Sequence, residues 1–289
     1  MKSAGIRPDR VTFSILMQAY AKKGDTESSE RIFAEMVLTG EMPDDVAFNT
    51  LLKRGDSKSA EKVCRRMEQA GVDPDIYTLN TLILAHVNHE DMERAERVLE
   101  KMEELSIQPT VLTFGTLMKG YVKQNRVAEA ERVLLAMHRA GVEPNVVAYN
   151  TLILAYVKNG QVAAAESILQ KMIVMGIQPS LVTFTTLMKA HAKRGNSKDA
   201  ENLMQRMMRA NIKPDKYAFS ALMKAHINSN NVAKAEEVLF QMRQAKIRPN
   251  SVTWTTLMQG YSNHGDVDSA ERIFARISEP DCISFNTLL

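Results

Sequence analysis

The sequence lacks the features that mark several common classes of protein. With two cysteines in 289 residues it has no disulfide framework, and no apolar run approaches the roughly 20 residues that a membrane-spanning helix needs. It contains neither the H-x-E…P-C-x-x-C signature of zinc deaminases nor a glycine-rich phosphate-binding loop. Its formal net charge is only +3, so a surface for a polyanion has to come from how the charges are distributed. These absences argue against a disulfide-stapled domain, a membrane protein and several familiar classes of enzyme.

Prolines are few, but their spacing is regular. They are 35, 31, 35, 35, 35, 35, 35 and 31 residues apart, and none falls outside this series. Similar segments recur with the same period: VTFSILMQAYAKKG begins at residue 11, LTFGTLMKGYVKQN at 112, VTFTTLMKAHAKRG at 182 and VTWTTLMQGYSNHG at 252. Self-similarity at such a period indicates a repeat array, in which each unit contacts only its neighbours. The usual length prior of about two globular domains therefore does not apply.

Each repeat is predicted to form two helices. In residues 146–180 the first helix is expected over about 147–158, before Asn159-Gly160, and the second over about 162–175, before Gly176 and Pro179. The two 31-residue repeats have each lost one helical turn, the earlier one from its first helix and the later one from its second. An Ala-Glu pair recurs in the second helices, where the small residue suits close packing. One further slot is predicted to be core; it holds Met36, Met67, Met102, Met137, Met172, Met207, Met242 and Ile277.

This pattern resembles the pentatricopeptide repeat. A 35-residue helix pair with TF/YNTLI/M and A-E…M…G-I-x-P-D/N recurs eight times along the chain. The resemblance implies an all-α fold, a right-handed α-solenoid of stacked helix-turn-helix repeats. The tetratricopeptide repeat, which would imply a peptide-binding groove, has 34 residues and a W-x₂-L-G-x₂-Y pattern that is missing here. The expected divisions are a partial repeat at 1–9, complete repeats at 10–44, 45–75, 76–110, 111–145, 146–180, 181–215, 216–250 and 251–281, and the start of a ninth at 282–289.

The resemblance also implies a function. Members of the family bind single-stranded RNA at about one base per repeat, mostly in mitochondria or chloroplasts, where they act in RNA processing, stability, translation or editing. Processing or editing proteins are implied as partners; a membrane, a cofactor and a small-molecule substrate are not. The alternative hypothesis is a structural or protein-interaction subunit of an organellar ribonucleoprotein or ribosome. No transit peptide is visible, and the start within a repeat indicates a segment of a longer array, so any editing domain would follow Leu289.

The distribution of charge favours RNA over a peptide. The first helices of all eight repeats contain a single acidic residue, Asp45, while acidic residues concentrate in the second helices. Lysines recur in the last turn of the first helix and one turn earlier. If the first helices line the concave side, as in the family, these lysines form a groove for phosphates. Lysine near a helix end is also common on a solvated face, but this does not explain the missing acids. The predicted phosphate contacts are Lys22, Lys53, Lys123, Lys158, Lys193, Lys119, Lys189 and Lys224.

In the family, two residues per repeat recognise a base: one in the first turn of the first helix (the first site) and one just after the proline that ends the repeat (the second site). A carboxylate accepts the ring N–H of G or U, and an amide or hydroxyl can donate to the ring acceptor of A or C. By resemblance, Ser or Thr at the first site goes with a purine, and Asn with a pyrimidine. The pairs are Ser14/Asp44 for G, Asn49/Asp75 for U, Asn80/Thr110 for C or U, Gly115/Asn145 for A or C, Asn150/Ser180 for C, Thr185/Asp215 for G, Ser220/Asn250 for A and Thr255/Asp281 for G. The implied target is 5′-GU(C/U)(A/C)CGAG-3′.

Each of these residue sets also has a plainer interpretation. The residue types at the second site are the preferred helix N-caps, although capping does not explain the restriction of the first site to Ser, Thr, Asn and one Gly. Apolar residues three positions before the first site would, by resemblance, clamp the bases, but packing between repeats is the alternative. This base-clamp set is Val11, Val46, Tyr77, Leu112, Val147, Val182, Tyr217 and Val252.

Histidine and cysteine are interpreted as structural residues. His86, His191 and His226 share one slot of the repeat with tyrosines, which indicates a half-buried aromatic position and not a zinc site. Cys64 shares a slot with Phe33 and several leucines, so it is predicted to be a packing residue. The sequence therefore predicts a protein that is not an enzyme and holds no metal or cofactor.

Overall fold

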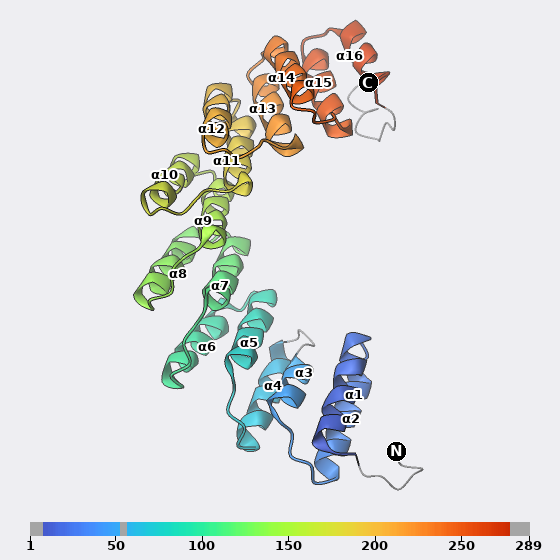
Figure 1. Cartoon of the computed structure of the whole chain (residues 1–289), viewed down its shortest axis with the longest axis vertical. Coiled ribbons are helices and arrows are strands. Elements are labelled where there is room, and N and C mark those ends of the chain that lie inside the picture. Colours follow the sequence, from blue (N-terminus) through green and yellow to red (C-terminus); the bar gives the residue numbers. More distant parts are fainter. Residues whose placement is uncertain (1–7, 53–56, 278–289) are drawn as a thin grey trace. The chain divides into compact units, whose positions relative to one another are not determined.

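The computed structural model describes residues 8–52 and 57–277, and all regular structure in these ranges is α-helical (Figure 1). The helices follow one another in pairs, which confirms the all-α fold. The first helices of the pairs are α1 (Arg10–Lys22), α3 (Asp45–Leu52), α5 (Ile76–Asn88), α7 (Val111–Lys123), α9 (Val146–Lys158), α11 (Leu181–Arg194), α13 (Lys216–Asn228) and α15 (Ser251–Asn263). The second helices are α2 (Thr26–Leu38), α4 (Ser57–Gln69), α6 (Met92–Glu104), α8 (Val127–Arg139), α10 (Val162–Val174), α12 (Ser197–Arg209), α14 (Val232–Gln244) and α16 (Val267–Phe274).

The helix ends follow from local chemistry. Within the described chain, the residue after each proline directly precedes a first helix, and most of these residues cap it; the side chain of Asp75, for example, accepts from the backbone N–H of Thr78 at 2.7 Å. The predicted breaks are confirmed, since α9 ends at Lys158, before Gly160, and α10 ends at Val174, before Gly176. Both glycines have positive φ, 75° and 72°, which a residue without Cβ adopts at little cost. The predicted loss of one turn is found in the last complete pair, where α16 has 8 residues; the end of α3 borders residues 53–56, which lie outside the described ranges.

The chain forms two compact units, one up to Pro144 and one from Asn145 onward. In the first unit α1, α3, α5 and α7 pack in series; in the second α9, α11, α13 and α15 do the same. Each second helix packs against its partner and, where a further pair follows in the same unit, against the next first helix. Within each unit, the described second helices have no backbone contact with one another. The first helices are therefore the more closely spaced layer, and their free surface is the inner side of each unit.

The core lies between the two helices of each pair. The seven methionines of the predicted core slot are fully buried, and Ile277 in the same slot is also buried. These methionines are thus core residues and do not form an exposed binding face. The alanines of the Ala-Glu pairs are buried as well, and so is Cys64, whose thiol pKa is raised to about 11 by burial. The predicted packing roles of these residues are confirmed.

The glutamate of the Ala-Glu pair links consecutive pairs of helices, which sequence reasoning missed. It reaches from a second helix to the histidine or tyrosine slot of the next first helix. Glu166 lies 3.1 Å from Nε2 of His191, Glu201 lies 3.2 Å from Nε2 of His226, and Glu236 accepts a hydrogen bond from Tyr261. The slot was predicted to be half-buried, but this is wrong for four members, which are fully buried because they pack beneath the neighbouring second helix. These four are His86, Tyr121, His191 and His226.

The same glutamates also pair with cations on the next second helix. Arg94 reaches Glu61 at 2.9 Å, and Lys234 reaches Glu201 at 2.9 Å. Because these pairs are partly exposed, each contributes little to the stability of the fold. They join second helices whose backbones do not touch, so Glu61 and Glu201 each link three helices of their unit.

We call the contact between the glutamate of an Ala-Glu pair and the histidine or tyrosine of the next first helix the clasp. His226 allows this clasp to be tested, because the charge of histidine changes near neutral pH. The neutral ring donates from Nε2 to Glu201, while Nδ1 has no hydrogen-bond partner among the described residues. Burial lowers the pKa of His226, and Lys234 lowers it further, against the opposing effect of Glu201 and Glu237. An unfolded histidine titrates near pH 6.5, roughly. The stability that the neutral histidine contributes is therefore complete above that pH and is lost as the pH falls through the lowered pKa.

We expect His226→Tyr to reduce the fall in melting temperature between about pH 7.5 and pH 5.5. Tyrosine occupies this slot in α15 and bonds to the equivalent Glu236, so the clasp is retained while the titrating group is removed. The measurement is thermal unfolding of both proteins by circular dichroism at the two pH values. His138→Tyr, at an exposed site on α8, is the matched control. An equal fall in wild type and His226→Tyr would contradict the prediction.

Candidate nucleic-acid interface

We call the exposed surface of the first helices in each unit the first-helix face. Seven of the eight lysines predicted to contact phosphates lie on it and are exposed, while Lys53 is outside the described residues. Asp45 is the only acidic residue within the first helices of the described chain. Lys123 forms an ion pair with Glu90 at 3.2 Å, but both side chains are more than half exposed. Such an exposed pair is weak, so a phosphate can compete for this lysine.

The base-clamp set is also exposed. All eight side chains have between 39% and 65% of their surface accessible, with Val46 at the lower end and Leu112 at the upper end. Packing between repeats does not account for apolar side chains that are this open to solvent. Each of them is the second residue of a first helix, so they recur at one level on successive first helices. The first-helix face thus presents an apolar row beside its lysines.

Most second-site residues are side-chain N-caps, as the plainer interpretation predicts, but capping does not use the whole side chain. Oδ1 of Asp215 accepts from the backbone N–H groups of Tyr217 and Ala218 at 3.0 and 2.9 Å. Oδ1 of Asn250 likewise accepts from the backbone N–H and the hydroxyl of Thr253 at 3.0 and 2.8 Å. In each residue the other polar atom, Oδ2 or Nδ2, takes no part in the cap. Capping and base recognition are therefore compatible, because they can use different atoms of one side chain.

Thr110, the second-site residue of the third repeat, caps α7 through a capping box with Thr113. Its backbone N–H donates to the Thr113 hydroxyl at 3.0 Å, and the two hydroxyls lie 3.3 Å apart. The Thr113 hydroxyl in turn donates to Asn80, the first-site residue of the same repeat, at 2.7 Å. The capping interpretation thus holds for Thr110 as well, and Thr113 connects this cap to Asn80.

Three first-site residues bond directly to their second-site partners. Ser14 donates to Asp44 at 3.5 Å, Asn49 donates to Asp75 at 3.4 Å, and Asn150 donates to Ser180 at 3.1 Å. These bonds cross 26 to 30 residues of sequence, so only the packing of one first helix against the next creates them. Burial raises the pKa of Asp75, but the hydrogen bonds from Thr78 and Asn49 outweigh it and keep the pKa below the ordinary value. Asp75 is thus an ionised acceptor at neutral pH.

The remaining first-site residues behave differently. The hydroxyls of Thr185, Ser220 and Thr255 donate to carbonyls four residues earlier in their own helices. Gly115 and Asn145 belong to different units, and Asp281 lies outside the described residues. The structure thus brings first and second sites into direct hydrogen-bond contact in some repeats and not in others.

One pocket, of about 410 Å³ on α11, α13 and α15, combines the three predicted residue classes. Its lining includes the lysines 189, 193 and 224, the apolar Tyr217 and Val252, and the recognition pair Ser220 and Asn250. The ammonium of Lys189 lies 5.4 Å from the centre of the Tyr217 ring, which is a cation–π distance. The pocket therefore offers positive charge, an aromatic surface and hydrogen-bonding groups within a single concavity.

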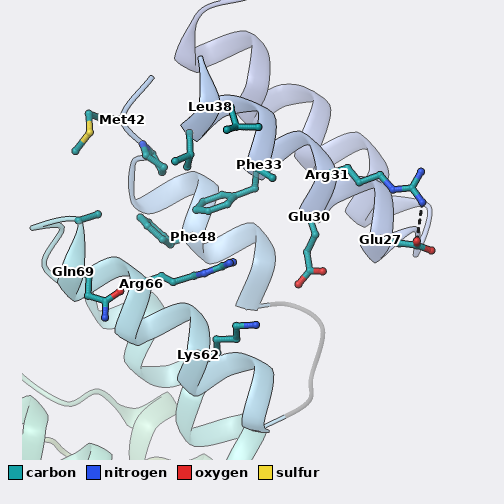
Figure 2. Close-up of a pocket in the computed structure, with 14 residues that line it drawn as sticks. Glu27, Glu30, Arg31, Phe33, Leu38, Met42, Phe48, Lys62, Arg66 and Gln69 are labelled. Carbon is teal, nitrogen blue, oxygen red and sulfur yellow. Dashed lines mark hydrogen bonds and ion pairs between the residues drawn. The ribbon is translucent and has the colours of Figure 1, made fainter. Parts of the chain in front are cut away.

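A larger pocket, of about 880 Å³, lies on α2, α3 and α4 and contains none of the predicted site residues (Figure 2). Its floor is formed by Phe33 and Phe48, whose ring centres are 5.2 Å apart, with the Arg66 guanidinium 5.9 Å from the centre of the Phe33 ring. The exposed side chains of Leu38 and Met42 border it. Because its lining is mainly that of the second helices, this pocket is separate from the first-helix face.

The described ranges contain no group of three or more His, Cys, Asp or Glu side chains that could bind a metal ion. In the same part of the chain, no helix combines the length and the apolar character needed to cross a bilayer.

Models of known protein families match most of the chain. The one described as "PPR repeat family" matches residues 8–54, 109–147, 144–193, 179–228 and 218–263. Those described as "Pentatricopeptide repeat domain" and "PPR repeat" match residues 62–124 and 252–282. No curated protein sequence matches the chain.

Solved pentatricopeptide repeat structures have the same fold of stacked helix pairs. The crystal structure of PPR10 in complex with an 18-nt psaJ RNA element has a TM-score of 0.63 and 23% identity, with 100% of this chain and 48% of that chain covered. The structure of PPR10 from maize has a TM-score of 0.55 and 20% identity, covering 99% and 57%. The PPR domain of Arabidopsis thaliana protein-only RNase P 1 in complex with tRNA has a TM-score of 0.53 and 15% identity, covering 67% and 97%. The chain thus spans about half the length of PPR10.

Proposed function

The chain belongs to the pentatricopeptide repeat family, and on this basis we propose that it binds single-stranded RNA along its first-helix face, about one base per repeat. The observation that carries the proposal is the pocket on α11, α13 and α15, where lysines, Tyr217 and the pair Ser220 and Asn250 occur together. Each of these groups matches one part of a nucleotide. The lysines suit the phosphates, the exposed ring suits a base face, and the polar pair suits a base edge.

The proposed order of bases follows the residue pairs along the chain. Asp44, Asp75 and Asp215 are acceptors for the ring N–H of G or U, whereas Asn250 can donate to A. The hydroxyl of Thr110 can donate or accept, so the third base stays C or U. The ionised state of Asp75 supports an acceptor role in the second repeat. The complete proposal is 5′-GU(C/U)(A/C)CGAG-3′, read in the same direction as the protein chain.

The base-clamp side chains have a place in the same proposal. They would hold each base from its faces, since they are apolar and exposed at one level of the first-helix face. A base face is apolar, and contact with it does not depend on which base is present. The clamp set would therefore contribute affinity, while the paired first and second sites would contribute specificity.

We further propose that the protein acts by occupying its RNA site in a mitochondrion or chloroplast, where it would affect processing, stability, translation or editing. This part of the proposal rests on family membership. No catalytic step, cofactor or small-molecule substrate is included, because each residue class in the pocket is accounted for by recognition of RNA. Proteins of RNA processing or editing are the proposed partners.

A selection experiment tests the proposal directly. After incubation with random single-stranded RNA, we expect the bound fraction to be enriched in the proposed octamer. An unlabelled single strand of that sequence should compete well, and a duplex of the same sequence poorly, because bases read one per repeat must be unpaired and splayed. Binding without enrichment, or equal competition by the duplex, would refute base recognition. If the protein bound none of the RNAs, the alternative role as a structural subunit would be favoured.

A further inference from the structure

A set of buried threonines lies directly behind the first-site residues. Thr78, Thr113 and Thr183 each occupy the third position of a first helix, and none has any exposed surface. Thr113 and Thr183 donate the hydroxyl hydrogen to the side-chain oxygen of the first-site asparagine on the preceding first helix, and the Thr78 hydroxyl is shared between that oxygen and Oδ1 of Asp75, which lies at 2.6 Å. The distances are 2.7 Å to Asn49, 2.7 Å to Asn80 and 2.6 Å to Asn150. All three first-site asparagines of the complete repeats therefore have a threonine partner.

Where the first-site residue is a hydroxyl, this partner is absent or serves another group. Ser14 and Thr185 are followed, at the equivalent position of the next first helix, by Ala47 and Ala218, which have no side-chain donor. Ser220 is followed by Thr253, whose hydroxyl donates to the second-site residue Asn250. For Thr255 the equivalent position lies outside the described residues; in the other repeats this threonine bonds to the first site only where that site carries asparagine.

In the fifth repeat the hydrogen bonds close into a ring. Nδ2 of Asn150 donates to the Ser180 hydroxyl at 3.1 Å, the Ser180 hydroxyl lies 3.1 Å from the Thr183 hydroxyl, and Thr183 donates to Oδ1 of Asn150. The Thr183 oxygen also accepts from the backbone N–H of Ser180 at 2.9 Å. If the amide of Asn150 rotated by half a turn, its NH₂ would face a hydroxyl whose accepting capacity is already used.

We infer that these threonines are positioning residues for base recognition: each fixes the amide of a first-site asparagine so that its oxygen points into the protein and its NH₂ group points toward the second site and the base. The inference rests on the proposed function. In the fifth repeat one N–H of Asn150 bonds to Ser180, which leaves the second N–H to donate to an acceptor on a pyrimidine. Without the threonine, either orientation of the amide becomes available, and a donor is no longer distinguished from an acceptor.

The test is the base preference at the fifth position of the octamer. We expect Thr183→Val, which keeps the β-branched shape and removes the hydroxyl, to reduce the preference for C over the other bases by about fivefold, the effect of one hydrogen bond. Preferences at the other seven positions should not change. Thr183→Ser retains the hydroxyl and should restore the preference for C. The measurement is the affinity of each protein for four octamers that differ only at the fifth base.

Two further variants make the outcome decisive. Thr12→Val removes a capping threonine at the third position of α1, whose hydroxyl bonds to Asp9, and should change no preference within the octamer. If Thr183→Val does not fold, Thr113→Val tests the preference for C or U at the third base in the same way. An unchanged preference for C at the fifth base would overturn the inference, whether binding to all four octamers is weakened equally or not at all. A wild-type protein without preference at these positions would instead overturn the proposed function.

Discussion

Asn250→Asp is expected to change the base preferred at the seventh position from A to G. Between octamers that differ only at that base, wild type should favour A by a factor of about 5 to 100. The variant should favour G by a similar factor. This range corresponds to about 1–3 kcal/mol, the usual cost of losing one specific base contact. The measurement is the affinity of both proteins for the two octamers in one buffer.

The structure explains why this substitution separates recognition from capping. Oδ1 of Asn250 accepts from the backbone and side chain of Thr253, and an aspartate can accept the same two bonds. Helix α15 should therefore keep its cap and nearly all its stability. The group that changes is Nδ2, a donor, which becomes a second carboxylate oxygen, an acceptor. The ring acceptor of adenine then meets an acceptor, whereas guanine offers a matching N–H.

Asn231→Asp is the matched control. Asn231 caps the second helix α14 by accepting from the backbone N–H of Lys234 at 3.1 Å, and it does not line the pocket. The control thus makes the same chemical change at a helix N-terminus outside the first-helix face. It should leave the preference at every base unchanged. If Asn250→Asp still prefers A, Asn250 serves only as a cap, and the proposed seventh base has no support.

Replacing Lys189, Lys193 and Lys224 together by glutamine is expected to weaken RNA binding by roughly a hundredfold at about 0.1 M salt. The estimate assumes one phosphate per lysine and a slope of about −0.7 per phosphate in the plot of log affinity against log salt. The slope should become shallower by about 2. Because counterion release contributes little to binding in concentrated salt, the RNA affinities of wild type and variant should become equal at about 1 M salt. The measurement is affinity for the octamer across a salt series.

Glutamine keeps much of the lysine stem and removes the charge, so the apolar part of the pocket stays largely intact. A triple replacement of Lys171, Lys198 and Lys213 by glutamine is the control, since these exposed lysines lie on or beside the second helices of the same unit. It makes the same change in net charge away from the proposed groove. Equal losses of affinity in the two triple variants would show that net charge, and not the first-helix face, determines binding. A loss that persists at high salt would contradict phosphate contact.

Much of this protein was predictable from sequence, because its information is local and repeated. A proline before an N-cap and a glycine or asparagine at a turn determine where helices begin and end through backbone geometry alone. The buried methionines follow from a single slot in the period, and the near absence of acids from the first helices can be counted directly. Eight copies of the pattern average out the ambiguity that affects any single segment.

Tertiary structure decided the features that depend on contacts between one repeat and the next. Val182 and Met188 are both apolar residues of α11, yet the first is exposed and the second is fully buried, because only the position of the neighbouring helices distinguishes them. The clasp between Glu201 and His226 and the bond from Thr183 to Asn150 join residues 25 and 33 positions apart. Periodicity within a helix carries no information on such pairs, since their distance is set by how one helix pair is placed on the next.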